Sequence, residues 1–340
     1  MSKDQVGIRA FGDDLKGNCD RLSEKILKGE FTPSRGFKYY MPKASRTHRT
    51  RTVLFIEDAL VYQAIANRIA EAQYDNVSQY DSFVFGSVLS PNVKKGLSIL
   101  EEEDPEYFFF QFWKSLFKKF KDSVIHSIEV DKVAYKFETD ITGFFDCIPH
   151  YNLLQTLSSS FNVEDEILDI LSECFNRWSG TKDSYTPGVG IPQGPVPSYL
   201  FANLLLHDLD KKIVGKGFSY YRYMDDISIY GYKEEEMLES LVTIDNYLKG
   251  NGLSLNSKKT SVEKIDHSVE DEKVKTLKKF KSFSFYGSEE DIVEAPKPKK
   301  PNPTKKIDTE LNKLSEQDQS RMNFGLPVVE TIVDKEDIIK

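Results

Sequence analysis

The sequence has little cysteine and histidine and no long apolar run. Its 340 residues include 3 cysteines at irregular spacing, so it predicts neither a disulfide framework nor a zinc site. The 5 histidines are scattered, and we interpret none as a metal ligand. No run of about 18 apolar residues is present, and the opening Met1-Ser2-Lys3-Asp4 contains no apolar signal region. These absences predict a cytoplasmic protein with no membrane partner.

Charge is plentiful but unevenly distributed. The net charge of −8 argues mildly against nucleic-acid binding, although its distribution matters more than its sum. Residues 31–56 contain no acid and hold the cations Arg35, Lys38, Lys43, Arg46, Arg49 and Arg51. We call this stretch the basic arm. It is expected to bind phosphates, with a solvated loop as the alternative.

Hydrophobic periodicity and breaker residues predict a mixture of helices and hairpins without a βαβ rhythm, which is an α+β chain. Helices are expected over 16–29, 57–71, 104–121, 149–159, 164–176, 197–213 and 234–250. The third should open with Asp104 as N-cap before Pro105. Strands are expected over 134–139, 253–255, 259–263 and 282–286. Residues 295–306 read as a Pro/Lys-rich linker, followed by a helix over 307–320.

Two aromatic, strand-prone runs flank a pair of adjacent acids in the stretch 220–230. These acids are Asp225 and Asp226, preceded by Met224. A tight turn between two strands would place at least one carboxylate at its tip, where it could bind Mg²⁺. A solvated hairpin turn is the alternative.

A second candidate metal ligand, Asp140, ends a predicted strand and is followed by Gly143, which permits a turn. One acid here and one at the hairpin tip could hold two metal ions about 3.5–4 Å apart. A helix-capping aspartate is the alternative. Between these two segments, residues 188–198 hold three glycines and three prolines around Pro192-Gln193-Gly194, and predict a stiff loop. We call it the Pro-Gln-Gly loop; its Gln193 could contact a base or a sugar.

The order of these segments resembles motifs A to E of the reverse transcriptase palm. After the hairpin come residues 252–260 (Gly-Leu-Ser-Leu-Asn-Ser-Lys-Lys-Thr) and residues 283–287 (Phe-Ser-Phe-Tyr-Gly). The resemblance covers roughly residues 35–290. It implies a right-hand polymerase with fingers and palm that copies an RNA template into DNA from dNTPs. It also implies two Mg²⁺ ions, with Mn²⁺ as an alternative.

The resemblance also implies roles for single residues. Asp140 and Asp225 match the metal ligands, with Asp226 adjacent and supporting. Phe145 matches the aromatic steric gate that excludes a ribose 2′-hydroxyl, with a core aromatic beside Phe144 as the alternative. Lys259 matches the motif D lysine, a candidate acid for the leaving pyrophosphate.

The remaining implied contacts lie in the fingers and at the primer. The basic arm resembles the fingers segment that holds the incoming triphosphate, with Arg49 and Arg51 as the predicted contacts. Gln193 and Gly194 are the predicted substrate contacts of the Pro-Gln-Gly loop, and residues 283–287 resemble the primer grip. We therefore divide the chain into an N-terminal segment with fingers (1–130), a palm (131–290) and a linker with a short helical tail (291–340).

Some features depart from the family pattern. Pro197-Ser198-Tyr199 replaces the usual Ser-Pro after the Pro-Gln-Gly loop, and Tyr286-Gly287 replaces the usual Leu-Gly. The C-terminal part predicts a short or atypical thumb, which leaves a homo-oligomer or a partner protein open as the means of holding the duplex. Retron signatures and a following maturase or endonuclease domain are absent. What remains resembles the compact bacterial enzymes of the abortive-infection and defence-associated groups. This implies antiphage defence, with a dedicated noncoding RNA template or protein priming.

Three alternatives stay open. The first is a retron- or intron-type reverse transcriptase. The second is an RNA-dependent RNA polymerase, although such enzymes usually carry Gly-Asp-Asp and lack both the Pro-Gln-Gly loop and the Phe gate. The third is an inactive scaffold that only binds RNA, which the intact Asp140, Asp225 and Asp226 argue against.

Overall fold

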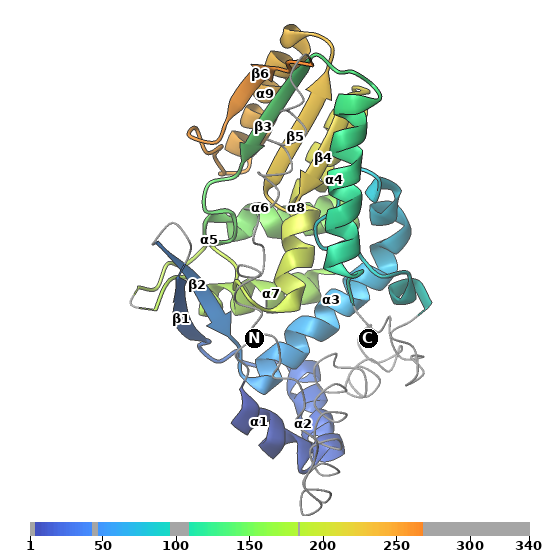
Figure 1. Ribbon diagram of the computed structural model, residues 1–340. Helices are drawn as coiled ribbons and strands as arrows, with labels where there is room; N and C mark the ends of the chain where they lie inside the picture. Colours follow the sequence, from blue (N-terminus) through green and yellow to red (C-terminus); the bar gives the residue numbers. More distant parts are fainter. Residues whose placement is uncertain (1–3, 43–46, 96–108, 183, 268–340) are drawn as a thin grey trace, which may run out of the picture.

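A computed structural model describes residues 4–42, 47–95, 109–182 and 184–267 (Figure 1). The α-helices in this part are α1 (Gln5–Gly12), α2 (Leu15–Leu27), α3 (Ile56–Val77), α4 (Trp113–Glu129), α5 (Phe144–Cys147), α6 (His150–Phe161), α7 (Asp165–Trp178), α8 (Val196–Val214) and α9 (Glu234–Gly250). The 3₁₀ turns are η1 (Ser78–Tyr80) and η2 (Pro91–Lys95). The strands are β1 (Phe37–Pro42), β2 (His48–Val53), β3 (Tyr135–Asp140), β4 (Ser219–Tyr223), β5 (Asp226–Gly231) and β6 (Ser261–Lys264).

Two antiparallel sheets organise the chain. Strands β1 and β2 form a hairpin of their own, while the larger sheet has the order β4-β5-β3-β6. Strand β3 is therefore central, paired with β5 on one side and β6 on the other. In Figure 1 the large sheet lies at the top, and the β1–β2 hairpin lies below it near α5. The end of β3 and the β4–β5 turn both lie at the lower edge of this sheet.

Helices cover the sheet and form the core beneath it. Helix α9 packs on β3, β5 and β6, and α4 packs on β4. Helix α8 is buried along most of its length, because it lies against α3, α6, α9 and β4. No helix in the described ranges has the length and apolar character needed to cross a bilayer.

The mixed α+β architecture was correctly predicted, and so were most helices. Helix α9 has its predicted bounds, while α2, α6, α7 and α8 agree within two residues. Helix α3 continues six residues beyond the predicted end at 71, to Val77. Helix α1 was not predicted, and the basic arm proves to be the β1–β2 hairpin.

Two predictions near the aromatic and motif D segments were wrong. The helix expected over 104–121 begins only at Trp113, because Phe109 and Phe110 pair with the backbone at Leu89 and Ser90 instead. The strand expected over 253–255 amounts to a single bridge between Leu255 and Ile141. The proposed cap at 104–105, the strand at 282–286, the linker and the tail helix lie outside the described residues.

A buried carboxylate joins the start of the basic arm to α3. Asp58 is 2% exposed and accepts the backbone N–H of Ser34 at 3.1 and 3.2 Å. The indole of Trp178 donates to the Ser34 carbonyl at 3.1 Å, so this loop is held from two sides. Burial raises the pKa of Asp58 to about 6, although the Ser34 hydrogen bond opposes the shift.

We expect Asp58 to make stability fall as pH rises. Its carboxyl has a higher pKa in the folded than in the unfolded chain, so the folded state binds more protons between about pH 4 and pH 6. The stabilisation is full below pH 4 and is lost above pH 6, a change of about 3 kcal/mol. Asp58→Asn should flatten this part of a chemical-denaturation pH profile. Asp75→Asn, on the exposed side of α3, is the control, and an unchanged profile in Asp58→Asn would contradict the assignment.

Candidate active site

Three aspartates meet at the lower edge of the large sheet. Asp140 is the last residue of β3 and lies directly opposite Asp226, the first residue of β5. Residues paired in this way leave the same face of an antiparallel sheet, with Cβ atoms about 5 Å apart. Asp225 lies in the turn beside them, and its carbonyl accepts the N–H of Ile141 at 3.3 Å. The structure thus brings the predicted metal ligands together.

The turn that presents Asp225 is tight and conformationally restricted. Only Met224 and Asp225 separate β4 from β5, and Met224 has φ of 56°, in the left-handed region that non-glycine residues rarely adopt. Gly86 packs so closely beneath it that a Cβ there would lie 2.4 Å from the Met224 nitrogen. The surrounding structure therefore fixes the turn in a conformation that it would not adopt alone.

Electrostatics couple the three aspartates to Lys259. Burial raises the pKa of Asp225, and the negative charge of Asp140 adds to this effect. Lys259 forms an ion pair and hydrogen bond with Oδ2 of Asp140. Although partial burial acts to lower it, the pKa of Lys259 is raised on balance by that hydrogen bond and by the aspartate charges. The structure thus places Lys259, the predicted acid for pyrophosphate, beside Asp140.

The carboxylates fit Mg²⁺ as an open site. Oδ1 of Asp140 is a buried acceptor with no hydrogen-bond partner within the described chain, as expected of an oxygen that binds a cation. Within the described ranges, no group of three or more His, Cys, Asp or Glu side chains is arranged so that it could hold a metal ion by itself. Mg²⁺ usually takes one or two carboxylates and completes its shell with water and substrate phosphates, so the donor set is suitable for it.

The predicted gate residue, Phe145, lies in the short helix α5 just beyond β3. Gly143 makes the turn with φ of 55°, as predicted. Phe145 is 6% exposed, and its ring meets Phe144 at 5.7 Å and Tyr199 at 5.3 Å between centroids. Its carbonyl accepts the N–H of Ile191 at 2.9 Å, so the gate segment is joined to the Pro-Gln-Gly loop.

The Pro-Gln-Gly loop lies along the edge of β2. The carbonyl of Gln193 accepts the N–H of Thr52 at 2.9 Å. Gly194 has φ of 136°, and a Cβ there would lie 3.0 Å from the Thr52 carbonyl oxygen. From the other side, Nε2 of His150 lies 2.7 Å from the Gly190 carbonyl oxygen. The loop therefore connects the β1–β2 hairpin to the gate segment.

The two faces of β2 carry different chemistry. Arg49 and Arg51 alternate with Thr50 and Thr52, so the arginines share one face and the threonines the other. The positive charge of Arg49 is close enough to lower the pKa of Asp225, although burial outweighs it. Arg51 is 7% exposed and donates to the Tyr199 hydroxyl at 3.1 Å. The predicted residues Lys43 and Arg46 of the basic arm lie outside the described residues.

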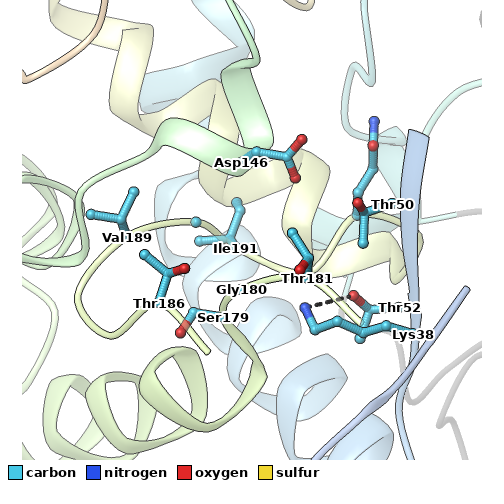
Figure 2. Close-up of a pocket in the computed structure, with 12 residues that line it drawn as sticks. Lys38, Thr50, Thr52, Asp146, Ser179, Gly180, Thr181, Thr186, Val189 and Ile191 are labelled. Carbon is cyan, nitrogen blue, oxygen red and sulfur yellow. Dashed lines mark hydrogen bonds between the residues drawn. The ribbon is translucent and has the colours of Figure 1, made fainter. Parts of the chain in front are cut away.

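The threonine face borders a polar pocket of about 150 Å³ (Figure 2). Lys38 extends across it from β1 toward Thr181, and Asp146 of α5 lies on the opposite side. The Lys38 ammonium donates to Thr52 Oγ1 at 3.4 Å and to the Trp178 carbonyl at 2.5 Å. Burial lowers the pKa of Lys38 to about 8, against the opposing charge of Asp146. Gln193 lines the same pocket, so this space adjoins the Pro-Gln-Gly loop.

Sequence reasoning missed a buried network beneath the turn. Arg222 of β4 is 1% exposed and forms a bidentate ion pair with Asp210 of α8, at 2.8 Å from Nε and 2.6 Å from Nη2. Its Nη1 donates to Asn203 Oδ1 at 2.9 Å and to the Met224 carbonyl at 2.8 Å. Although burial alone acts to lower it, the charge of Asp210 raises the pKa of Arg222. Arg222 thus holds the backbone of the turn itself.

The network reaches the segment beneath the turn as well. The amide of Asn203 donates to the carbonyls of Gly86 and Ser87 at 2.8 and 3.2 Å. Tyr220 donates to Asp210 at 2.6 Å. The one available sequence signal was a cation within an apolar strand, since a buried arginine requires a partner.

Comparisons with known proteins show which family the chain is similar to. Residues 41–289 match the family model described as reverse transcriptase (RNA-dependent DNA polymerase). The chain is 27% identical over 219 residues to an uncharacterized 91 kDa protein in cob intron of Schizosaccharomyces pombe, covering 62% of this chain and 23% of that protein. The chain thus spans about a quarter of that relative's length.

Two solved structures are also similar. Telomerase from Candida albicans, in complex with a fragment of telomeric RNA, has a TM-score of 0.49 and 13% identity, covering 75% of this chain and 46% of that one. Apo telomerase from Candida tropicalis has a TM-score of 0.46 and 14% identity, covering 76% of this chain and 50% of that one.

The Arg222–Asp210 pair generates a stability prediction. Arg222→Met leaves Asp210 buried without its charge partner, so the free energy of unfolding should fall by about 3–5 kcal/mol. Adding Asp210→Asn removes the stranded charge and should recover part of the loss. Chemical denaturation of the single and double variants measures this coupling.

Lys249→Met is the matched control, because it breaks the exposed Lys249–Asp245 pair on α9 and should cost less than about 1 kcal/mol. If the losses in the free energy of unfolding from Arg222→Met and Asp210→Asn simply add in the double variant, the two residues do not act as a pair.

Proposed function

The chain belongs to the reverse transcriptase (RNA-dependent DNA polymerase) family, and we propose that it adds deoxynucleotides to a primer on an RNA template. The observation that carries this proposal is the convergence of Asp140, Asp225 and Asp226 at one sheet edge. The gate segment with Phe145 follows directly after the strand that ends in Asp140. The order of these parts matches what two-metal nucleotidyl transfer requires.

Asp140 and Asp225 would hold two Mg²⁺ ions, with Asp226 supporting them. When bound, two such ions activate the attacking 3′-hydroxyl and stabilise the leaving pyrophosphate. The buried Oδ1 of Asp140, which has no hydrogen-bond partner among the described residues, supports this assignment. Mn²⁺ is the alternative ion, because it accepts the same oxygen ligands.

The chain's own cations would handle the phosphates. Lys259 lies beside Asp140, where its ammonium can serve as the acid for the pyrophosphate oxygen. Arg49 and Arg51 project from the same face of β2, and the influence of Arg49 on Asp225 supports its position near the metals. We propose that these two arginines bind the triphosphate while Gln193 contacts the sugar or base.

The partners we propose are an RNA template, its DNA product and dNTPs. We also propose that a homo-oligomer or a partner protein helps to hold the duplex. The setting that we propose is the cytoplasm of a bacterial cell, in antiphage defence, with a noncoding RNA template or protein priming.

The resemblance of the motif series to compact defence-associated enzymes supports this setting. One observation favours a second candidate, an intron-type enzyme, because the curated relative is a protein in cob intron. Sequencing the nucleic acid that co-purifies with the protein separates the two. A dedicated noncoding RNA supports the first candidate, whereas intron RNA supports the second. Asp225→Asn should abolish protection in a phage-plating assay if the first is correct.

Metal binding generates the first activity prediction. Asp140→Asn and Asp225→Asn keep the side-chain shape but remove the charge that binds the ions, so primer extension should fall at least about 100-fold. The assay is run over a range of Mg²⁺ and Mn²⁺ concentrations, with thermal unfolding as the measure of fold. Asp245→Asn, on α9 away from the sheet edge, is the control. Near wild-type incorporation by Asp225→Asn would overturn the assignment.

The second activity prediction concerns the choice between dNTPs and NTPs. If the Phe145 ring lies beneath the incoming sugar, Phe145→Tyr should preserve the preference for dNTPs. Phe145→Ala should admit NTPs and lower the ratio of kcat/KM for dNTP over NTP. Because Phe145 is buried, the alanine variant should also lose about 3–5 kcal/mol of stability. A folded, active alanine variant with an unchanged ratio would contradict the gate. A wild-type preference for NTPs would instead indicate an RNA-dependent RNA polymerase.

A further inference from the structure

One buried tyrosine touches two residues that the proposed function places on opposite parts of the nucleotide. Tyr199 lies in the first turn of α8 and is 3% exposed. Its ring meets Phe145 edge to face, with centroids 5.3 Å apart and planes at 70°. Its hydroxyl accepts a hydrogen bond from Arg51 Nη1 at 3.1 Å. Tyr199 therefore connects the sugar gate with a phosphate-binding cation.

The position of Tyr199 is fixed by the Pro-Gln-Gly loop. Helix α8 begins at Val196, two residues after Gly194, so Tyr199 is carried on the same rigid segment as Gln193. That segment is attached to β2 through the hydrogen bond between Thr52 and Gln193. The Pro-Gln-Gly loop thus positions both residues that Tyr199 contacts, Arg51 on β2 and Phe145 on α5.

A steric gate discriminates only as well as its ring resists displacement. If the Phe145 ring could shift, a 2′-hydroxyl would push it aside and the ribonucleotide would be accepted. Phe144, which also contacts the ring, is its chain neighbour and moves with the same short helix. Tyr199 packs against Phe145 from another element, and closely packed interiors transmit such support efficiently.

We propose that Tyr199 is a specificity-determining positioning residue: its ring supports the Phe145 gate and its hydroxyl orients Arg51 toward the triphosphate. This inference rests on the proposed polymerase function. It also gives a role to the departure at Pro197-Ser198-Tyr199, where this sequence differs from the family pattern that it otherwise resembles.

Two substitutions of Tyr199 separate the contact of its ring with Phe145 from the contact of its hydroxyl with Arg51. Tyr199→Phe keeps the ring and removes the hydroxyl that accepts the hydrogen bond from Arg51. The triphosphate is common to dNTPs and NTPs, so KM should rise about 3-fold or more for both while their ratio of kcat/KM stays constant. Tyr199→Met fills similar space without a rigid ring, so the dNTP preference should fall about 10-fold.

The experiment measures two quantities for each variant. Primer extension on an RNA template gives kcat/KM for dNTP and NTP, and equilibrium binding in Ca²⁺ gives the two nucleotide affinities without turnover. Tyr62→Phe is the matched control, since its hydroxyl contacts Ser198 on α8 at 3.0 Å and its ring stacks on Phe201 instead. This control should leave both quantities at wild-type values. Thermal unfolding confirms that each variant is folded.

The outcomes distinguish the inference from the proposed function. If the Tyr199→Met variant is folded and keeps the wild-type dNTP preference, Tyr199 does not support the gate. If this variant does not fold, Tyr199→Leu is measured instead. An unchanged KM in Tyr199→Phe overturns the Arg51 role. Effects of Tyr199→Phe and Arg51→Gln on KM that are not additive support it. A wild-type protein that neither incorporates nor binds nucleotide overturns the proposed function, and the inference with it.

Discussion

The guanidinium of Arg222 connects the β4–β5 turn to helix α8, and the geometry of the aspartates depends on it. Nε and Nη2 of this group donate to Asp210, while Nη1 donates to the Met224 carbonyl at 2.8 Å. The turn needs this support because Met224 has a φ that a free chain would rarely adopt. A buried ion pair gives little net stability over an apolar pair, but it strongly penalises rearrangement that separates its partners. Arg222 therefore contributes precision more than stability.

The β4–β5 turn must be held firmly because negative charges lie close together at the sheet edge. Asp140, Asp225 and Asp226 repel one another, and burial raises the pKa of Asp225 further. Lys259 offsets part of this repulsion through its ion pair with Asp140. Antiparallel pairing of β3 with β5 holds Asp140 opposite Asp226 despite the repulsion, because the backbone register is fixed along the whole strand. The stability of the sheet thus maintains a site that would otherwise separate.

The sequence predicted those parts of the site that depend only on neighbouring residues, such as strand propensity and a turn at a glycine. The Met224–Asp226 hairpin, the Asp140 strand end and the turn at Gly143 follow from strand propensity and glycine, and the structure contains all three. Contacts between elements were not predictable in the same way. The helix start at Trp113 was missed because Phe109 and Phe110 pair with a distant segment. Arg222 and Asp210 lie on different elements, so the sequence alone did not indicate their pairing.

The same distinction applies to the substrate side of the site. Phe145, Gln193 and Arg51 were each identified from motifs, but their relative placement is a tertiary property. It results from backbone hydrogen bonds that join Ile191 to Phe145 and Thr52 to Gln193. Because those bonds involve main-chain atoms, side chains at the non-glycine positions of the loop can vary without moving the backbone. A change such as tyrosine at position 199 can therefore alter how firmly Phe145 and Arg51 are held while Asp140, Asp225 and Asp226 stay in place. If the proposed function holds, the edge of the large sheet sets the chemistry, and the Pro-Gln-Gly loop can adjust the selectivity.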